Sequence, residues 1–391
     1  MRSVIPTERL TALEPKSVSA RWRRSLAVGL PGLLAAVLSL RALLFAGVAA
    51  EPGGLPATNA IIDVHAHAAG LGYGSECHVS PALRDSYKLA FYFASFGVTA
   101  DELEEQGDAL VIQRIAEGVA ESRSVGRAIV LALDGVVDER GELDLERTEL
   151  YVPNEFVARE TAKYQELWFG ASVNPYRRDA LERLERARAD GAKLVKWIPS
   201  IQMIDPADPR LTPFYRKLVE LGLPLLSHAG QERSFTSARD ELADPARLRL
   251  PLELGVTVIV AHIASTGANE GERDTDRLRA LFGEFPNVYS EISSLTQVNK
   301  LGYLREALTT PEFEGRLFYG SDFPLVATPL VSPWYFPLQL TISQMIEISA
   351  IDNPWDRDVA LKRALGTPPE LFARADRFFA ERDRAEGDAH P

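Results

Sequence analysis

From about residue 58 onward, short apolar runs alternate along the chain with longer charged stretches. Apolar runs of this length are typical of strands that are buried on both faces, as in a parallel sheet. The pattern predicts eight such strands, at residues 60–64, 128–133, 167–173, 192–197, 224–227, 256–261, 288–292 and 317–320.

The stretches between these runs have the periodicity of amphipathic helices. Residues 178–190 place Leu184 and Ala187 on one side of a helix and charged residues on the other, and Gly191 follows as a typical helix stop. Strands that alternate with helices form βαβ units, and eight such units close into a barrel. We therefore expect an α/β fold, a (β/α)8 TIM barrel over residues 58–385, with residues 68–127 as an elaborated loop over the barrel mouth.

The first fifty residues have a different composition. They carry seven Lys and Arg against two Glu, a local charge of +5. Since the net charge of the chain is −12, the rest of the chain carries −17. Three arginines at residues 21–24 precede an uncharged run over residues 25–40, and small residues follow at 48–50. This order is typical of an export signal cleaved after Ala50, and Arg23-Arg24 resembles a twin-arginine signal.

Two alternatives to a cleaved signal fit the same segment. Residues 25–50 are long enough for a retained membrane anchor, although Arg41 would cost roughly 2.5–3.5 kcal/mol at mid-membrane. Because the arginines come first, a signal or an anchor would place the barrel outside the cytoplasm. The other alternative is an amphipathic or disordered extension of a cytoplasmic protein.

The bulk composition limits the class of partner. With 46% hydrophobic and 25% charged residues, the chain is typical of a globular protein. Its acidic body lacks the clustered Lys and Arg that neutralise phosphates, so we expect a small-molecule substrate and no nucleic-acid partner. Cys77 is the only cysteine, which excludes an internal disulfide and a thiolate zinc site.

Candidate ligand residues stand at the ends of the predicted strands, and they include four of the six histidines. His65 and His67 end the first strand, Lys196 the fourth, His228 the fifth, His262 the sixth and Asp322 the eighth. Taken singly, each has a simpler explanation: a structural histidine, a chance His-x-His pair, a Gly-Ser-Asp turn, or a lysine in an ion pair.

Taken together, the same residues predict a metal site. Residues two apart in a strand point the same way, so His65 and His67 can both face the barrel interior. The carboxyl ends of barrel strands meet at the face where such enzymes hold their active sites. Imidazole and carboxylate groups are ligands for zinc and similar divalent ions.

With this ordered set, residues 61–366 resemble the amidohydrolase superfamily of metal-dependent (β/α)8 hydrolases. The Gly-Ser-Asp-Phe-Pro turn at residues 320–324 resembles the branch that contains hydrolases and metal-dependent decarboxylases. The resemblance implies that His65, His67, His228 and Asp322 contact the metal, and that Asp322 also moves the proton of the attacking water.

The resemblance leaves the number of metal ions open. In members with two ions, a carboxylated fourth-strand lysine bridges them and the sixth-strand histidine binds the second, which are the positions of Lys196 and His262. In members with one ion, the sixth-strand histidine is catalytic, and a fourth-strand lysine binds substrate in some. We favour one ion, with Zn²⁺ as the expected metal, His262 catalytic and Lys196 facing the pocket.

Water bound to zinc has a pKa of about 7, low enough to supply a nucleophile at neutral pH. We therefore expect hydrolysis of an amide, ester or lactone. The alternatives are a non-oxidative decarboxylase that uses the same site, and a catalytically silent metal-binding protein. Arg233 and Trp197 are candidates for substrate contacts, against simple packing or surface charge as alternatives.

Overall fold

The computed structural model describes residues 61–389 of the chain. The segment expected to act as a signal or anchor, residues 1–50, lies outside the described residues. Within residues 61–389, no helix is both long and apolar enough to cross a membrane.

All eight apolar runs coincide with parallel strands. These strands are β1 (Ile61–His67), β3 (Val125–Leu131), β5 (Leu167–Gly170), β6 (Val195–Trp197), β7 (Leu225–Ser227), β8 (Val258–Val260), β11 (Val288–Glu291) and β12 (Leu317–Phe318). Two short antiparallel pairs add β2 (His78–Val79) with β4 (Leu150–Tyr151), and β9 (Ala268–Asn269) with β10 (Glu272–Arg273).

The eight strands form two parallel sheets, not the single closed barrel that we expected. One sheet has the order β1-β3-β5 and the other β12-β11-β8-β7-β6. The two sheets meet at two junctions, which we call seams. At the seam between β5 and β6, Ala171 bridges to Val195, and at the seam between β1 and β12, Val64 N donates to Tyr319 O at 3.2 Å. Strands as short as β6 and β12 supply few ladder hydrogen bonds, so each seam consists of isolated backbone contacts. The architecture is a mixed α/β fold.

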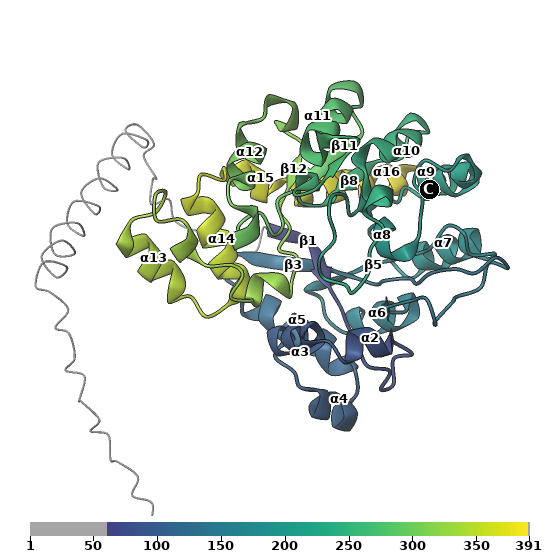
Figure 1. Cartoon of the computed structure of the whole chain (residues 1–391), viewed down its shortest axis with the longest axis horizontal. Coiled ribbons are helices and arrows are strands. Elements are labelled where there is room, and N and C mark those ends of the chain that lie inside the picture. The colour runs from purple at the N-terminus through teal and green to yellow at the C-terminus, as the bar shows by residue number, and fades with distance from the viewer. Residues whose placement is uncertain (1–60, 390–391) are drawn as a thin grey trace, which may run out of the picture. The chain divides into compact units, whose positions relative to one another are not determined.

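Helices follow the strands and surround them in Figure 1. The longer ones are α5 (Ala109–Glu121), α6 (Asn154–Thr161), α7 (Ala180–Ala189), α9 (Thr212–Glu220), α11 (Asp274–Glu284), α12 (Tyr303–Thr309), α13 (Ile342–Ser349), α14 (Pro354–Ala364) and α16 (Arg374–Ala389), with short α8 (Pro199–Gln202), α10 (Arg249–Glu253) and α15 (Pro369–Phe372) between them. Single 3-10 turns are η1 (Pro209–Leu211), η2 (Asp240–Ala243), η3 (Pro245–Leu248), η4 (Ala261–Ala264), η5 (Val298–Lys300), η6 (Pro311–Phe313), η7 (Leu325–Ala327) and η8 (Pro333–Tyr335). The helix expected over residues 178–190 is α7.

The long segment between β1 and β3 contains three further helices, α2 (Pro81–Arg84), α3 (Tyr87–Phe96) and α4 (Ala100–Gln106). Its first turn is organised by the buried carboxylate of Asp108, which accepts hydrogen bonds from Leu71 N at 2.9 Å and Gly72 N at 2.8 Å. Gly70 is required there because a Cβ would lie 2.5 Å from Asp108 Oδ2.

The core has an inner and an outer layer. The inner cluster takes one or two side chains from most of the parallel strands and is completed by α16; its buried members are Ile62, Val64, Ile129, Leu131, Leu194, Leu226, Ile259, Ala261, Phe318, Ala375 and Phe379. Arg382 of α16 donates to Gly222 O, ahead of β7, and contacts Thr257, ahead of β8. This helix therefore packs at the amino ends of the strands and leaves their carboxyl ends available for a site.

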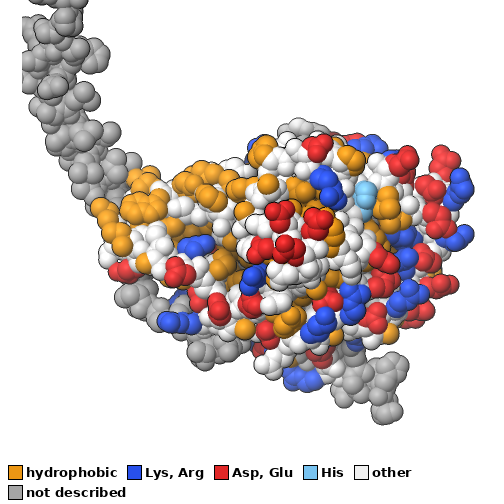
Figure 2. Space-filling model, turned by 90° about the horizontal axis from the view of Figure 1, so that it is seen from below, with side chains coloured by type: hydrophobic (Ala, Val, Ile, Leu, Met, Phe, Trp, Pro, Cys, Tyr) orange, Lys and Arg blue, Asp and Glu red, His pale blue; other side chains and the backbone are white. Residues whose placement is uncertain are grey.

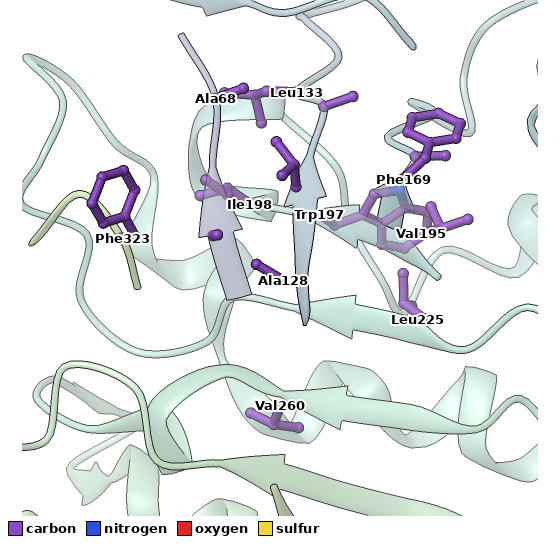
Figure 3. Packing of buried hydrophobic residues seen from close by; sticks show 14 of the residues in the cluster. Ala68, Ala128, Leu133, Phe169, Val195, Trp197, Ile198, Leu225, Val260 and Phe323 are labelled. Atoms are coloured by element: carbon purple, nitrogen blue, oxygen red, sulfur yellow. The ribbon is translucent and has the colours of Figure 1, made fainter. Parts of the chain in front are cut away.

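The outer layer lies between strands and helices, and Trp197 is one of its largest members. The indole is 0% exposed, stacks on Phe214 of α9 with ring centroids 5.3 Å apart, and donates from Nε1 to Val173 O at 2.8 Å. Figure 3 shows it among Phe169, Val195 and Leu225. On the surface, acidic and basic side chains are interspersed across the face seen in Figure 2.

Replacing Trp197 by alanine should reduce the free energy of unfolding by about 3–5 kcal/mol, because it leaves a large cavity in the outer core. Urea denaturation followed by circular dichroism measures this change. Trp334→Ala, at a side chain that is 51% exposed, is the matched control and should cost about 1 kcal/mol or less. Equal losses in the two variants would contradict this assignment of Trp197 to the core.

Candidate metal centre

A bulge in β1 turns two histidines toward the same space. The register of β1 against β3 shifts between Asp63 and Ala66, which places one extra residue in β1. Such an extra residue re-aims the side chains that follow it. Val64 packs in the inner core, and the Nε2 atoms of His65, inside the bulge, and of His67, beyond it, lie 3.0 Å apart.

The turn after β12 brings Asp322 to this pair. Asp322 N donates to His65 O at 2.9 Å, and His67 N donates to Phe323 O at 2.8 Å, so the turn is paired with the end of β1. Ser321 Oγ adds a hydrogen bond to Asp63 Oδ2 at 2.5 Å. The backbone of Asp322 has φ 61°, a left-handed conformation uncommon outside glycine, and the surrounding contacts hold it there.

Three ligand atoms converge as a result. Asp322 Oδ1 lies 3.6 Å from His65 Nε2 and 3.2 Å from His67 Nε2, and the ligand atoms of this group all lie within 4.8 Å of one another. A tetrahedral ion with ligands at 2.0–2.1 Å needs ligand atoms about 3.3–3.4 Å apart. His65, His67 and Asp322 are therefore positioned to bind a divalent metal ion.

Glu291, at the carboxyl end of β11, orients this group. His65 Nδ1 donates to Glu291 Oε1 at 3.1 Å, which leaves His65 Nε2 with its lone pair toward the ligand cluster. The Glu291 carboxylate also accepts from His262 N at 2.8 Å and from Ser293 Oγ at 2.8 Å. Burial raises the pKa of Glu291, but the hydrogen bonds and charge of His65 outweigh it and leave the pKa below its ordinary value.

Protonation states in the site suit metal binding, which requires neutral imidazole and ionised carboxylate. Burial, and then the charge of Lys196, lower the pKa of His65 to about 4. Burial of Asp322 alone would raise its pKa, but the adjacent imidazoles of His65 and His67, including a hydrogen bond from His67, hold it well below its usual range.

Lys196 extends into the same cluster from the end of β6. Its side chain is 1% exposed, and Nζ donates to His65 Nε2 at 2.9 Å. Burial lowers the pKa of this ammonium to about 8. The lysine thus lies against a ligand atom of the group.

His228 and His262 form a second pair. His262 Nε2 and His228 Nδ1 lie 3.1 Å apart, and Glu232 Oε2 is 3.6 Å from His228 Nδ1. Burial lowers the pKa of His228 to about 4 and that of His262 well below its ordinary value. The three-residue metal group does not include His228, whose buried Nε2 has no hydrogen-bond partner among the described residues.

A cavity of about 150 Å³ joins both groups, and its lining includes His65, His67, Lys196, His228, His262 and Asp322. Its wall includes residues of α2 and α3, so the long segment after β1 covers the site as expected. Arg233 also lines the cavity, with an exposed side chain that donates to Gln231 Oε1. Trp197 does not line it: the prediction of a substrate contact there was wrong, because Lys196 faces the interior and its neighbour in the strand faces the helices.

Three residues of the site went unnoticed in the sequence: Glu291, Gln297 and Lys300. Glu291 could have been found in the way that the ligand residues were, since it is a charged residue near the end of the predicted strand 288–292. Gln297 and Lys300 lie in an irregular segment after β11 and line the cavity. Local periodicity carries no signal for such positions.

The chain matches the amidohydrolase family over residues 62–338, more than half of its length, and it belongs to that family. The expected membership of the superfamily is thereby confirmed. A comparison with curated proteins finds no match.

Solved structures with a similar fold include an uncharacterized TIM-barrel protein from Bordetella bronchiseptica, with a TM-score of 0.52, 15% identity and coverage of 83% of this chain and 99% of the other. Others are 5-carboxyvanillate decarboxylase from Sphingomonas paucimobilis (TM-score 0.43, 12% identity, 82% and 98% coverage) and dihydroorotase from Campylobacter jejuni (TM-score 0.41, 13% identity, 83% of both chains). The first of these supports a fold of the TIM-barrel type.

Glu291→Gln should weaken zinc binding about 10- to 100-fold, because a neutral amide oxygen is a weaker acceptor for His65 Nδ1–H than the carboxylate and makes the imidazole a less basic ligand. Competition with a fluorescent zinc chelator measures the affinity. Glu160→Gln is a matched control, since Glu160 is also buried but pairs with Arg159 of α6 and with Lys163 just after this helix. Unchanged zinc affinity in Glu291→Gln would contradict this positioning role.

Proposed function

We propose that this protein is a metal-dependent hydrolase that cleaves an amide, ester or lactone, with one divalent ion held by His65, His67 and Asp322. The observation that carries the proposal is the convergence of three ligand atoms within 4.8 Å of one another in a buried cavity. Two imidazoles with one carboxylate are a ligand set of catalytic zinc, which we take as the metal, and the same set also binds iron(II).

A second observation supports the fit. His228 Nε2 is a buried nitrogen without a partner among the described residues, and the residue lines the same cavity. Buried polar atoms in folded proteins are nearly always paired, so this atom is suited to contact a bound ligand. We propose that His228 completes the coordination or contacts the substrate.

Bound at these residues, the ion would supply an acidified water molecule and a Lewis acid for the carbonyl group. Asp322 then acts as the proton carrier: one oxygen faces the histidines, and Oδ2 accepts a hydrogen bond from Ser294 Oγ at 2.5 Å. The carboxylate takes a proton from the attacking water and returns it to the leaving group.

We propose that His262 stabilises charge on the substrate oxygen. Ser265 Oγ lies 3.4 Å from its Nδ1 and His228 Nδ1 lies 3.1 Å from its Nε2, so the ring is held at both nitrogens. A donor held at the position of a developing oxyanion lowers the barrier because it needs no reorganisation. Exclusion of water by the apolar lining would strengthen this interaction.

Asp322→Asn should reduce kcat/KM about 10²- to 10⁴-fold, because the amide cannot accept the proton. The measurement is hydrolysis of a panel of aryl esters, anilides and lactones by the zinc-loaded enzyme, with bound zinc determined in parallel. Asp205→Asn, outside the cavity lining, is the control and should keep full activity. Full activity in Asp322→Asn would contradict the role, and carbon dioxide release from aromatic acids without any hydrolysis would favour a decarboxylase instead.

Metal content distinguishes one ion from two. With a single ion, the wild-type protein and Lys196→Ala should each retain one equivalent by elemental analysis, because the ligands of the three-residue group remain in both. Lys193→Ala, at a lysine paired with Asp383 outside the cavity, is the control. Two equivalents in the wild type that fall to one or none in Lys196→Ala would instead indicate a pair of ions bridged by a carboxylated lysine.

A further inference from the structure

The turn after β11 presents two polar side chains to the cavity. Lys300 N donates to Gln297 O at 2.9 Å within the turn, and Val298 N donates to Leu330 O at 2.9 Å. Gln297 also bridges to Val331 in the segment that follows η7. The backbone is therefore held at both ends of the turn, and Gln297 and Lys300 both line the cavity.

Lys300 is a buried cation without a close counter-ion. The residue is 9% exposed, and among residues 61–389 its Nζ forms no ion pair and no hydrogen bond. A buried charge without a partner is costly, at several kcal/mol per ion. Burial lowers the pKa of Lys300, and the carboxylates of Asp322, Glu232 and Glu291 act on it only from a distance.

Gln297 adds a second donor without a partner. The residue is 4% exposed, and its buried Nε2 has no hydrogen-bond partner among the described residues. One turn thus offers an ammonium and an amide N–H to the same cavity. A carboxylate, with two oxygens that each accept hydrogen bonds, matches this pair of donors.

The carboxylates of the protein itself are already engaged. Asp322 is bound by Ser294 and faces the two histidines of β1. Glu291 accepts from His65, and Glu232 Oε1 accepts from Ser234 N at 2.6 Å. A ligand is therefore the natural source of the missing anion.

The remaining lining is suited to an apolar group. The α3 side chains of Leu89, Tyr92, Phe93 and Phe96 line the cavity, as do Phe235 and Leu325. The cavity measures about 150 Å³, and an apolar cavity on the order of 150 Å³ accommodates a benzene ring.

We infer that the substrate is a carboxylic acid with one apolar group about the size of an aromatic ring, and that Lys300 and Gln297 bind its carboxylate. The inference rests on the proposed function, since it concerns recognition at the same site. A singly charged anion fits better than a phosphate dianion, because the turn supplies one ammonium and the more distant carboxylates of Asp322, Glu232 and Glu291 disfavour further negative charge.

The test is calorimetric titration of the zinc-loaded full chain with phenylacetate and with the isosteric neutral phenylacetamide. Phenylacetate should bind the wild type about 10- to 100-fold more tightly, the usual contribution of a charged hydrogen bond. Lys300→Met, which keeps the aliphatic stem, should remove this preference, and Lys300→Arg should keep most of it. Gln297→Leu should reduce the preference by about tenfold or less.

Lys217→Met is the matched control, because Lys217 lies on α9 and pairs with Glu185 and Glu220. If Lys300→Met does not fold, Lys300→Gln replaces it. Equal binding of the acid and the amide by the wild type, or binding of neither, would overturn the inference. A preference for phenylacetate over phenylacetamide that persists in Lys300→Met would also overturn the inference, since the carboxylate would then be bound by the metal ion alone.

The two proposals can fail separately. Lys300-dependent binding of phenylacetate in a protein that hydrolyses no ester, anilide or lactone would leave this inference intact and overturn the hydrolase. Hydrolysis that depends on Asp322, with no effect of Lys300→Met on the binding of the acid, would support the hydrolase and overturn this inference.

Discussion

The pairing of β1 with the turn after β12 is the constraint on which the site depends. Backbone hydrogen bonds join His65 O to Asp322 N and His67 N to Phe323 O, and Ser321 is bound to the buried carboxylate of Asp63. These contacts connect the first and last strands of the fold and also place the three ligand atoms together. The same few hydrogen bonds therefore serve both the tertiary structure and the chemistry.

Around this pairing of β1 with the turn after β12, several ionisable side chains are buried close together. The ionisable groups there have hydrogen-bond partners: Glu291 for His65, Ser294 for Asp322, and His65 Nε2 for the ammonium of Lys196. Lys300 is the exception among the buried charges that line the cavity. Such an imbalance in an otherwise well-paired environment is the basis of the proposed carboxylate site, because a bound anion would relieve it.

The positions of the strands were predictable because strands buried on both faces need continuous apolar runs, whatever their neighbours are. The residues at the strand ends were predictable for the same reason, since a parallel sheet brings its carboxyl ends to one edge. The sequence could not show how the ends of the two sheets meet. The seams depend on isolated backbone contacts at Val64 and Val195, which leave no periodic signal.

From the sequence alone, eight strands, their order and the residues at their ends were determined, together with the family that those residues resemble. Only the tertiary structure decided which of them meet: His65 and His67 with Asp322, and His228 with His262. It also turned Trp197 toward the helices and brought Glu291 and Lys300 to the cavity. The physical reason is that a strand's periodicity fixes which residues share a face, whereas bulges and loops decide what that face meets, through contacts between residues far apart in the chain.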